Sequence, residues 1–234
     1  MENKRIRKFN EISWVLGLVL LTLGVCIMSK AGFGVSMIVS PAYVLHLALV
    51  KHLPWFTFGT SEYIFQGVLL LIMCLVIRRF RWQYLLSFVC AFIYGLLLDG
   101  WIWIFGGVEF NLLYERILAF IVGELLSGLS IALFFRTYMP LEVYDSFVME
   151  ICSVYKLNQG KIKWVYDFSM LLLAVILTLC INGNLTGIGV GTFVCAIVNA
   201  PLITIFGKML DKFISFDAMF PSLERVIGCV GKGE

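Results

Sequence analysis

The sequence predicts an all-α membrane protein that crosses the bilayer several times, and three observations point to this class. The 234-residue chain is 61% hydrophobic and only 14% charged, whereas a soluble domain carries roughly 25% charged residues. Six apolar runs are long enough to span a bilayer as helices. The basic residues gather in the short stretches between these runs, so the net charge of +3 is a topology signal rather than a nucleic-acid footprint.

The expected elements follow one another along a single membrane domain, 1–234. The six predicted spans are 12–29, 57–77, 83–105, 115–135, 164–181 and 188–207. Two further elements, 35–50 and 141–155, are shorter than the about 20 residues that a spanning helix needs. We therefore expect two re-entrant or half helices, followed by a cytoplasmic tail at 211–234.

The basic clusters predict the orientation of the chain. Residues 4–8 and 78–81 carry the densest positive charge, and both stretches belong in the cytoplasm by the positive-inside rule. An even number of crossings must separate them, so the short element 35–50 should enter the membrane without crossing it. Both termini are then expected on the cytoplasmic side of the cell membrane.

The chain also shows signs of an internal repeat. The tetrapeptide at 88–91, Phe-Val-Cys-Ala, recurs at 193–196, about 105 residues later. Two pseudo-repeats, about 10–105 and 113–210, each contain a span, a short helix and two further spans. Three crossings per half is an odd number, so the second half should insert upside down. Such an inverted repeat is a building plan of secondary transporters.

Four segments carry a resemblance to a known family. KAGFGVSMIVSPAYVLH, FTFGTSEY, LEVYDSFVMEI and GIGVGTFVCAIVNAPLI resemble the YczE/YitT-like bacterial integral membrane proteins. The resemblance covers nearly the whole chain. It implies a protein of the bacterial cytoplasmic membrane, in a family of poorly defined function that is associated with transport.

Glu124 is the most anomalous residue, because it lies within the fourth predicted span. A charged carboxylate at this depth is costly, so it must be protonated, paired or exposed to a wet cavity. One interpretation makes it a proton or cation coupling site. The other makes it a structural hydrogen bond between spans.

Four further polar residues fall at related positions in the two halves. Glu62 and Asp167 lie near the starts of their spans, where they suit a pair of gates or simply interact with the helix dipole. Asp99 and Asn199 lie on stripes of small residues and either face a central cavity or belong to a packing seam.

The two short elements carry different side chains at their beginnings. Gly32, Gly34 and Ser36 lie where the first would begin, which suits an anion at a helix N-terminus. Glu142 and Asp145 begin the second, which suits a neutral or cationic solute. The sequence leaves both alternatives open. A further break before the last span is formed by Gly187, Gly189 and Gly191, with Thr192 opening the helix.

The expected function is a membrane transporter or facilitator of a small solute, working by alternating access between two inverted halves. The alternatives are a substrate-binding membrane subunit of an ATP-driven uptake complex and a non-transporting assembly or sensor protein. No catalytic motif is present and the cysteines form no CxxC pair, so we expect no enzyme, cofactor or metal site. The expected partners are the lipid bilayer, a small-molecule substrate and a proton or cation, with no nucleic acid. Self-association into a homo-oligomer is left open.

Overall fold

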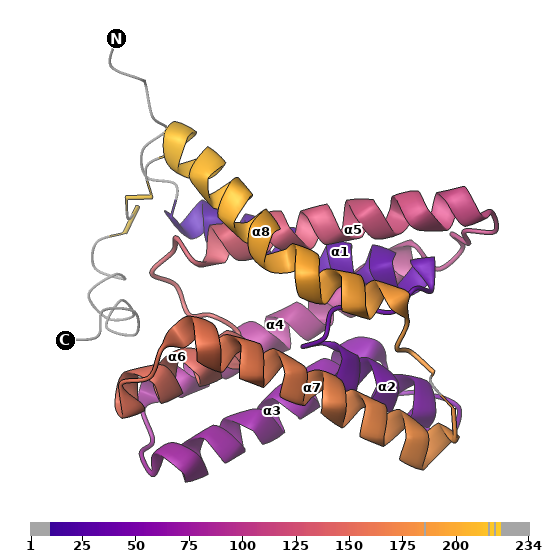
Figure 1. The fold of residues 1–234 in the computed structure, drawn as a ribbon, viewed down its shortest axis with the longest axis horizontal. Helices are drawn as coiled ribbons and strands as arrows, with labels where there is room; N and C mark the ends of the chain where they lie inside the picture. The colour runs from indigo at the N-terminus through magenta and orange to yellow at the C-terminus, as the bar shows by residue number, and fades with distance from the viewer. Residues whose placement is uncertain (1–9, 185, 215, 218, 221–234) are drawn as a thin grey trace.

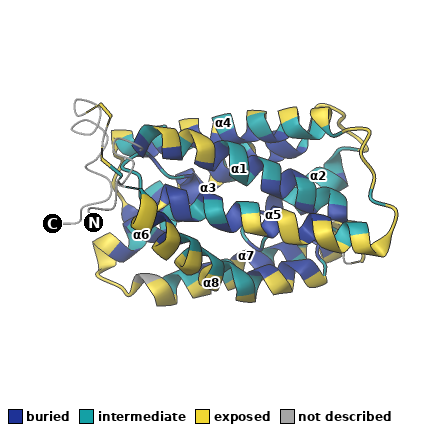
Figure 2. Ribbon diagram, turned by 90° about the horizontal axis from the view of Figure 1, so that it is seen from above, coloured by how far each residue is buried: buried dark blue, intermediate teal, exposed yellow. Residues whose placement is uncertain are grey.

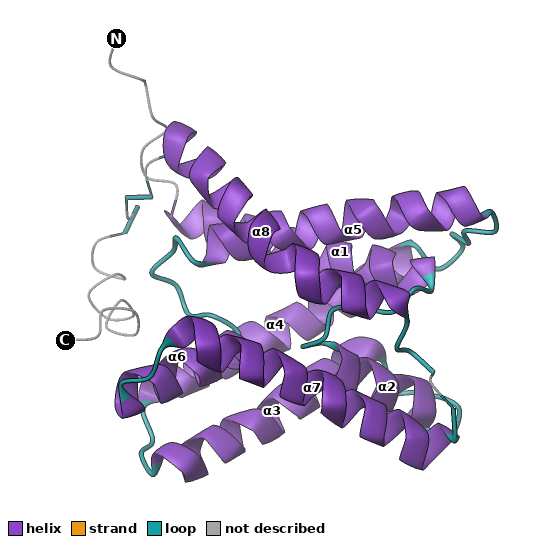
Figure 3. Cartoon of the chain, in the orientation of Figure 1, coloured by secondary structure: helices purple, strands orange, loops and turns teal. Residues whose placement is uncertain are grey.

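The computed structural model describes residues 10–184, 186–214, 216–217 and 219–220, and this part of the chain folds into eight helices (Figures 1 and 3). They are α1 (Asn10–Ala31), α2 (Ser40–Leu49), α3 (Phe58–Ile77), α4 (Trp82–Ile104), α5 (Leu113–Phe134), α6 (Val143–Tyr155), α7 (Gln159–Asn182) and α8 (Val190–Phe213). The predicted all-α class is confirmed. Most of the predicted tail lies outside the described residues.

Six of these helices are long and apolar enough to cross a membrane, and each coincides with one of the six predicted spans to within a few residues, apart from longer ends. The other two, α2 and α6, have 10 and 13 residues. The chain is therefore a multi-pass membrane protein. Figure 2 shows that the long helices carry both buried and exposed residues along their length.

The first short helix begins later than the sequence predicts. Gly32 and Gly34 adopt positive φ angles of 71° and 95°, and α2 starts only at Ser40, with Pro41 in its first turn. Proline is favoured there because the first N–H groups of a helix have no partner within it. Ser36 consequently lies in the preceding loop, and the prediction that it occupies a helix N-terminus is wrong.

The bundle has two chemically distinct ends. We call one the basic end, which contains the loop at 78–81, and the other the far end, which contains the loop at 105–112. The start of α1 and the segment that follows α8 meet at the basic end, where Asn10 Nδ2 donates to Phe216 O at 3.0 Å. Tyr155 donates to Val76 O at 3.0 Å, which places the end of α6 there as well.

The short helices lie at opposite ends of the bundle. In Figure 1, α6 is at the left with the basic end, whereas α2 is at the right with the far end. The long helices α1 and α5 run antiparallel, since Ser130 Oγ donates to Gly17 O at 2.6 Å and Arg116 Nε donates to Ala31 O at 2.8 Å. This arrangement agrees with the charge-based topology, in which α2 enters without crossing.

We divide the helices into two groups; in Figure 1, α1, α5 and α8 lie above α2, α3, α6 and α7, and α4 runs between them and also packs closely on α3. Group one contains α1, α4, α5 and α8, where α1 packs on α5 and α4, and α5 packs on α8. Group two contains α2, α3, α6 and α7, where α2 packs on α7 and α3, and α6 packs on α3 and α7. The main contacts between the groups are those of α4 with α3 and α6.

Group one is centred on a direct backbone contact between α1 and α5. A Cβ atom on Gly24 would lie 2.7 Å from Gly123 O, and a Cβ atom on Gly123 would lie 2.8 Å from Gly24 O. Only glycine at both positions permits this approach. Small residues favour helix association in lipid, where van der Waals packing replaces the hydrophobic effect as the main attraction between helices.

Replacing Gly123 by leucine should therefore destabilise the fold. The side chain would force α1 away from α5, and overpacking of this kind costs about 1–3 kcal/mol. Gly100→Leu is the matched control, because a Cβ atom at Gly100 meets nothing within 4 Å. Thermal unfolding of the two purified variants should show a lower midpoint for Gly123→Leu alone. Equal midpoints would contradict the close contact.

The two ends of the bundle should be accessible from opposite sides of the membrane. Single cysteines placed at His52 and Arg79 in a cysteine-free background lie at the far end and the basic end, respectively. We expect an impermeant thiol reagent to label position 52 on intact cells and position 79 only after the cells are opened. Labelling of position 79 but not position 52 on intact cells would show that α2 crosses the bilayer.

Candidate functional site

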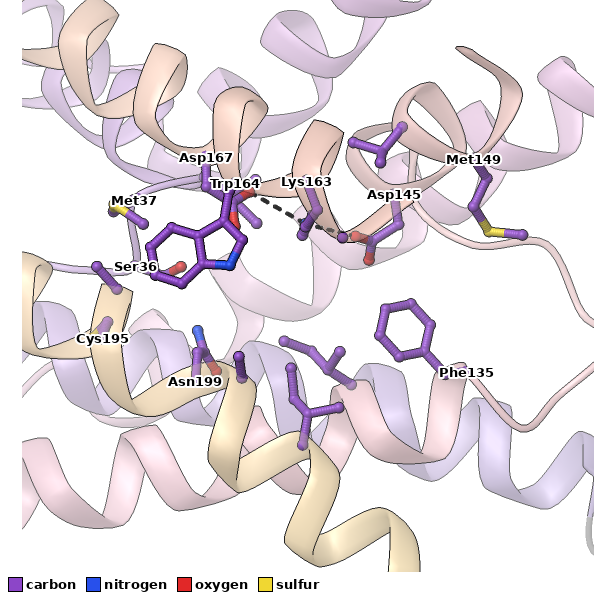
Figure 4. Close-up of a pocket in the computed structure, with 17 residues that line it drawn as sticks. Ser36, Met37, Phe135, Asp145, Met149, Lys163, Trp164, Asp167, Cys195 and Asn199 are labelled. Atoms are coloured by element: carbon purple, nitrogen blue, oxygen red, sulfur yellow. Dashed lines mark hydrogen bonds and ion pairs between the residues drawn. The ribbon is translucent and has the colours of Figure 1, made fainter. Parts of the chain in front are cut away.

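A cavity of about 330 Å³ lies between α6, α7 and α8 (Figure 4). Residues 36–38 of the loop before α2 close it near the middle of the bundle. Its walls reach the basic end through Phe135 at the end of α5 and Gly160 at the start of α7. The cavity therefore runs from the interior of the bundle toward one end only.

Three charged side chains meet on one wall of the cavity. Lys163 Nζ lies 2.9 Å from Asp145 Oδ1 and 3.3 Å from Asp167 Oδ1. Lys163 and Asp167 are one helical turn apart on α7, and Asp145 belongs to the first turn of α6, so the packing of these two helices creates the triad. With two carboxylates and one ammonium group, the triad carries a net charge of −1 when all three groups are ionised.

Polar and aromatic groups also line the cavity. Asn199 of α8 points into the cavity from the side opposite Trp164 of α7, and Ser36 lies near the Trp164 ring in this view (Figure 4). Asn199 Oδ1 is buried and accepts no hydrogen bond from the described residues. The remaining walls are mostly apolar and include Met37, Phe135 and Met149.

A second polar cluster is buried where α3 meets α6. Gln66 Nε2 lies 3.5 Å from Glu62 Oε2 and 3.4 Å from Glu142 Oε2, so one amide group serves two carboxyl groups. Gln66 Oε1 also accepts from Val143 N at 3.2 Å, at the first turn of α6. Tyr144 donates to Glu62 Oε2 at 2.9 Å.

This cluster contains more acceptors than donors. Glu62 Oε1, Glu142 Oε1 and the Tyr94 hydroxyl are buried without a hydrogen-bond partner among the described residues. Burial and the neighbouring charge of Glu62 raise the pKa of the Glu142 carboxyl well above its usual value. Protonation of Glu142 is favoured at such a position, because the neutral form avoids both the desolvation cost and the repulsion.

The buried cluster and the cavity occupy related positions in the two halves of the chain. The offset of 105 residues that relates Glu62 to Asp167 also relates Tyr94 to Asn199. The first pair lies on α3 and α7, and the second lies on α4 and α8. Where α3 and α4 pack together, the polar groups are buried; where α7 and α8 stand apart, they line a cavity.

Glu124 is buried on α5, and neither of its oxygens has a hydrogen-bond partner in the described part of the chain. The Cys195 thiol of α8, which also lines the cavity, is close enough to interact with the carboxyl group. Glu124 therefore lies behind the cavity wall rather than on it. Both interpretations of Glu124, as a coupling site or as a structural group, remain predictions.

The other predicted site residues have packing roles. Asp99 Oδ1 accepts from Gly59 N at 2.8 Å, so it holds the start of α3 against α4. Thr192 is buried, and a Cβ atom on Gly34 would collide with its hydroxyl. Gly189 caps α8, Gly187 has a φ of 83° in the loop before it, and Gly191 already belongs to the helix.

Sequence reasoning did not find Gln66, Tyr144, Lys163 or Trp164. A partial signal was available for two of them, because Gln66 follows Glu62 by four residues and Lys163 precedes Asp167 by four. That spacing puts each pair on one helix face. The contacts with α6 depend on tertiary packing and leave no such mark in the sequence. Within the described residues, no group of three or more His, Cys, Asp or Glu side chains is arranged to hold a metal ion.

The fold defines the chain as a multi-pass helical membrane protein. Residues 8–208 match a family of unknown function, DUF6198, and the chain belongs to that family. It is also similar to the uncharacterized protein YyaS of Bacillus subtilis (strain 168), with 25% identity over 198 residues that cover 84% of this chain and 92% of the relative. No solved structure matches the chain. The YczE/YitT-like resemblance remains a prediction.

Replacing Gln66 by leucine should destabilise the protein, because it removes the donor shared by Glu62 and Glu142. An unsatisfied buried polar group costs about 1–3 kcal/mol. Gln83→Leu is the matched control, since Gln83 lies in the first turn of α4 and is only partly buried. Thermal unfolding should show a loss for Gln66→Leu that clearly exceeds the loss for Gln83→Leu. Equal losses would argue against the shared donor.

Proposed function

We propose that this protein is a membrane transporter of a small solute and that it works by alternating access between the two helix groups. The observation that carries the proposal is the unequal packing of related helices. The cavity reaches the basic end between α7 and α8, whereas the related helices α3 and α4 are packed together. This is the arrangement expected of a transporter that is open on one side.

The remaining helix contacts support a movement of one group against the other. The pairs α1–α4 and α5–α8 pack within group one, and the pairs α2–α7 and α3–α6 pack within group two. The internal repeat relates the α1–α4 pair to the α5–α8 pair and the α2–α7 pair to the α3–α6 pair, so related pairs lie within the same group. The contacts of α4 with α3 and α6 have no such counterpart. The repeat relates them to contacts of α8 with α7 and α2, and α8 makes little contact with either helix among the described residues. In the opposite orientation, α8 would approach α7 and α2 while α4 would move away.

The sizes of related residues explain why α3 and α4 are packed together whereas α7 and α8 stand apart. A Cβ atom on Gly59 would collide with the carbonyl oxygen of Gly95, so these two glycines allow α3 and α4 to touch. The offset of 105 residues relates Gly59 to Trp164 and Gly95 to Ala200. Both of these larger residues line the cavity. Trp164 prevents an equally close approach of α7 and α8 in its present rotamer.

Transport by this mechanism predicts two distances that change in opposite directions. Spin labels at Gly160 and Ile203 report the separation of α7 and α8 at the basic end, because both residues line the cavity. Labels at the exposed residues Trp55 and Trp103 report the separation of α3 and α4 at the far end. In lipid nanodiscs, pulsed electron resonance should detect two populations for each pair. Conditions that shorten the first distance should lengthen the second.

The control pair lies within group one. Leu16 of α1 and Phe135, which follows α5, are both exposed and flank the contact between Gly17 and Phe134. Their distance should stay constant while the other two change. A single fixed distance for all three pairs, in several lipid compositions and pH values, would contradict alternating access.

A further inference from the structure

We propose that the solute taken up by the cavity is a small organic cation with an apolar body. This inference rests on the proposed function, because it assigns a chemical class to the solute of the same cavity. It is argued from the charge of the cavity, the groups still available for bonding and the shape and polarity of the walls.

The charge of the cavity favours a cation. Asp145 and Asp167 provide two carboxylates, and Lys163 provides the single ammonium group between them. The three side chains are 18%, 20% and 28% exposed, respectively, so they are partly withdrawn from solvent but still reach the cavity surface. An incoming ammonium group gains two carboxylate neighbours and meets one like charge. An incoming carboxylate gains one ammonium neighbour and meets two like charges, which is less favourable.

The walls favour an apolar and preferably aromatic body. Trp164 presents its ring to the cavity beside the carboxylates, as Figure 4 shows. A cation held over a tryptophan face is attracted by the ring quadrupole, and an apolar group packs well against the same face. Met37, Phe135 and Met149 complete an apolar lining. The unpaired Asn199 Oδ1 is a further acceptor for an N–H donor.

The related site in the closed half has the same character. Glu62 and Glu142 are buried beside Tyr94 and Tyr144, and no lysine or arginine is hydrogen-bonded or ion-paired to either carboxyl group among the described residues. If α4 moves away from α3 and α6, a solute that leaves toward the far end meets a second acidic and aromatic surface. Both orientations of the transporter then present acidic side chains to the solute.

The volume limits the size of the solute. About 330 Å³ is near the lower limit of small-molecule sites, which span about 300–1,000 Å³. A molecule with one aromatic ring and a short alkylammonium chain is of suitable size. Phenethylammonium, phenylacetate and phenethyl alcohol share this ring and differ in charge, so they form a matched set of probes.

The test measures binding of these three probes to the purified full chain in lipid nanodiscs by thermal shift. A ligand that binds the folded state raises the unfolding midpoint with increasing concentration. We expect phenethylammonium to do so at lower concentration than the other two probes. Asp145→Asn and Asp167→Asn should each weaken its binding about tenfold, and Trp164→Leu should weaken it about threefold.

Lys163→Met provides the sharpest comparison. It removes the like charge from the cavity, so phenethylammonium should bind several-fold more tightly to this variant. A merely structural role for Lys163 would weaken binding instead. Glu109→Gln is the control, because Glu109 is an exposed residue at the far end and lies outside this cavity. Its affinity should equal that of the unmodified protein.

Several results would overturn the inference. If phenylacetate binds more tightly than phenethylammonium and loses affinity in Lys163→Met, the cavity selects anions. If phenethyl alcohol binds as tightly as phenethylammonium, charge has no role. If no probe binds while the spin-label distances change as expected, the solute class is wrong and the transporter proposal stands. If the distances also stay fixed, both proposals fail.

Discussion

The thickness of the hydrocarbon core is the constraint on which this architecture depends. Helices of 10 and 13 residues rise about 15–20 Å, and the core is about 30 Å thick. Neither α2 nor α6 can cross it, so each returns the chain to the end from which it entered. Each half of the molecule then contains three crossings, and α5 begins at the far end although α1 begins at the basic end. The antiparallel contact of α1 with α5 follows from this odd number.

The short helices also determine where the polar groups meet. Because α6 stays near the basic end, its first turn brings Glu142 and Tyr144 to α3 and Asp145 to α7. The loop before α2 brings Ser36 to the opposite side of the cavity. Non-helical backbone at membrane depth is tolerated where it lies within protein or lines a cavity. The two breaks in the helical pattern therefore coincide with the two polar regions of the bundle.

Hydropathy was sufficient to predict the long helices. Every long helix overlaps a predicted span, because the need for apolar residues in lipid leaves a strong local signal. The start of α2 was misplaced by five residues, since Gly32 and Gly34 were taken as its beginning when they form the preceding turn. The polar side chains were harder to assign. Asp167 and Asn199, which were candidate site residues in the sequence, both line the cavity, but Lys163 lies between two carboxylates only because α6 and α7 pack together.

The pairing of Gly59 with Gly95 and of Trp164 with Ala200 has an energetic consequence for the proposed movement. We expect the two orientations of the molecule to differ in free energy, because closing α7 on α8 displaces or repacks an indole ring and separating α3 from α4 breaks the contact between Gly59 and Gly95. The unloaded protein should therefore rest predominantly with its opening toward the basic end. Solute binding or an ion gradient must then supply the free energy that populates the opposite orientation, so the transport cycle has a preferred resting state.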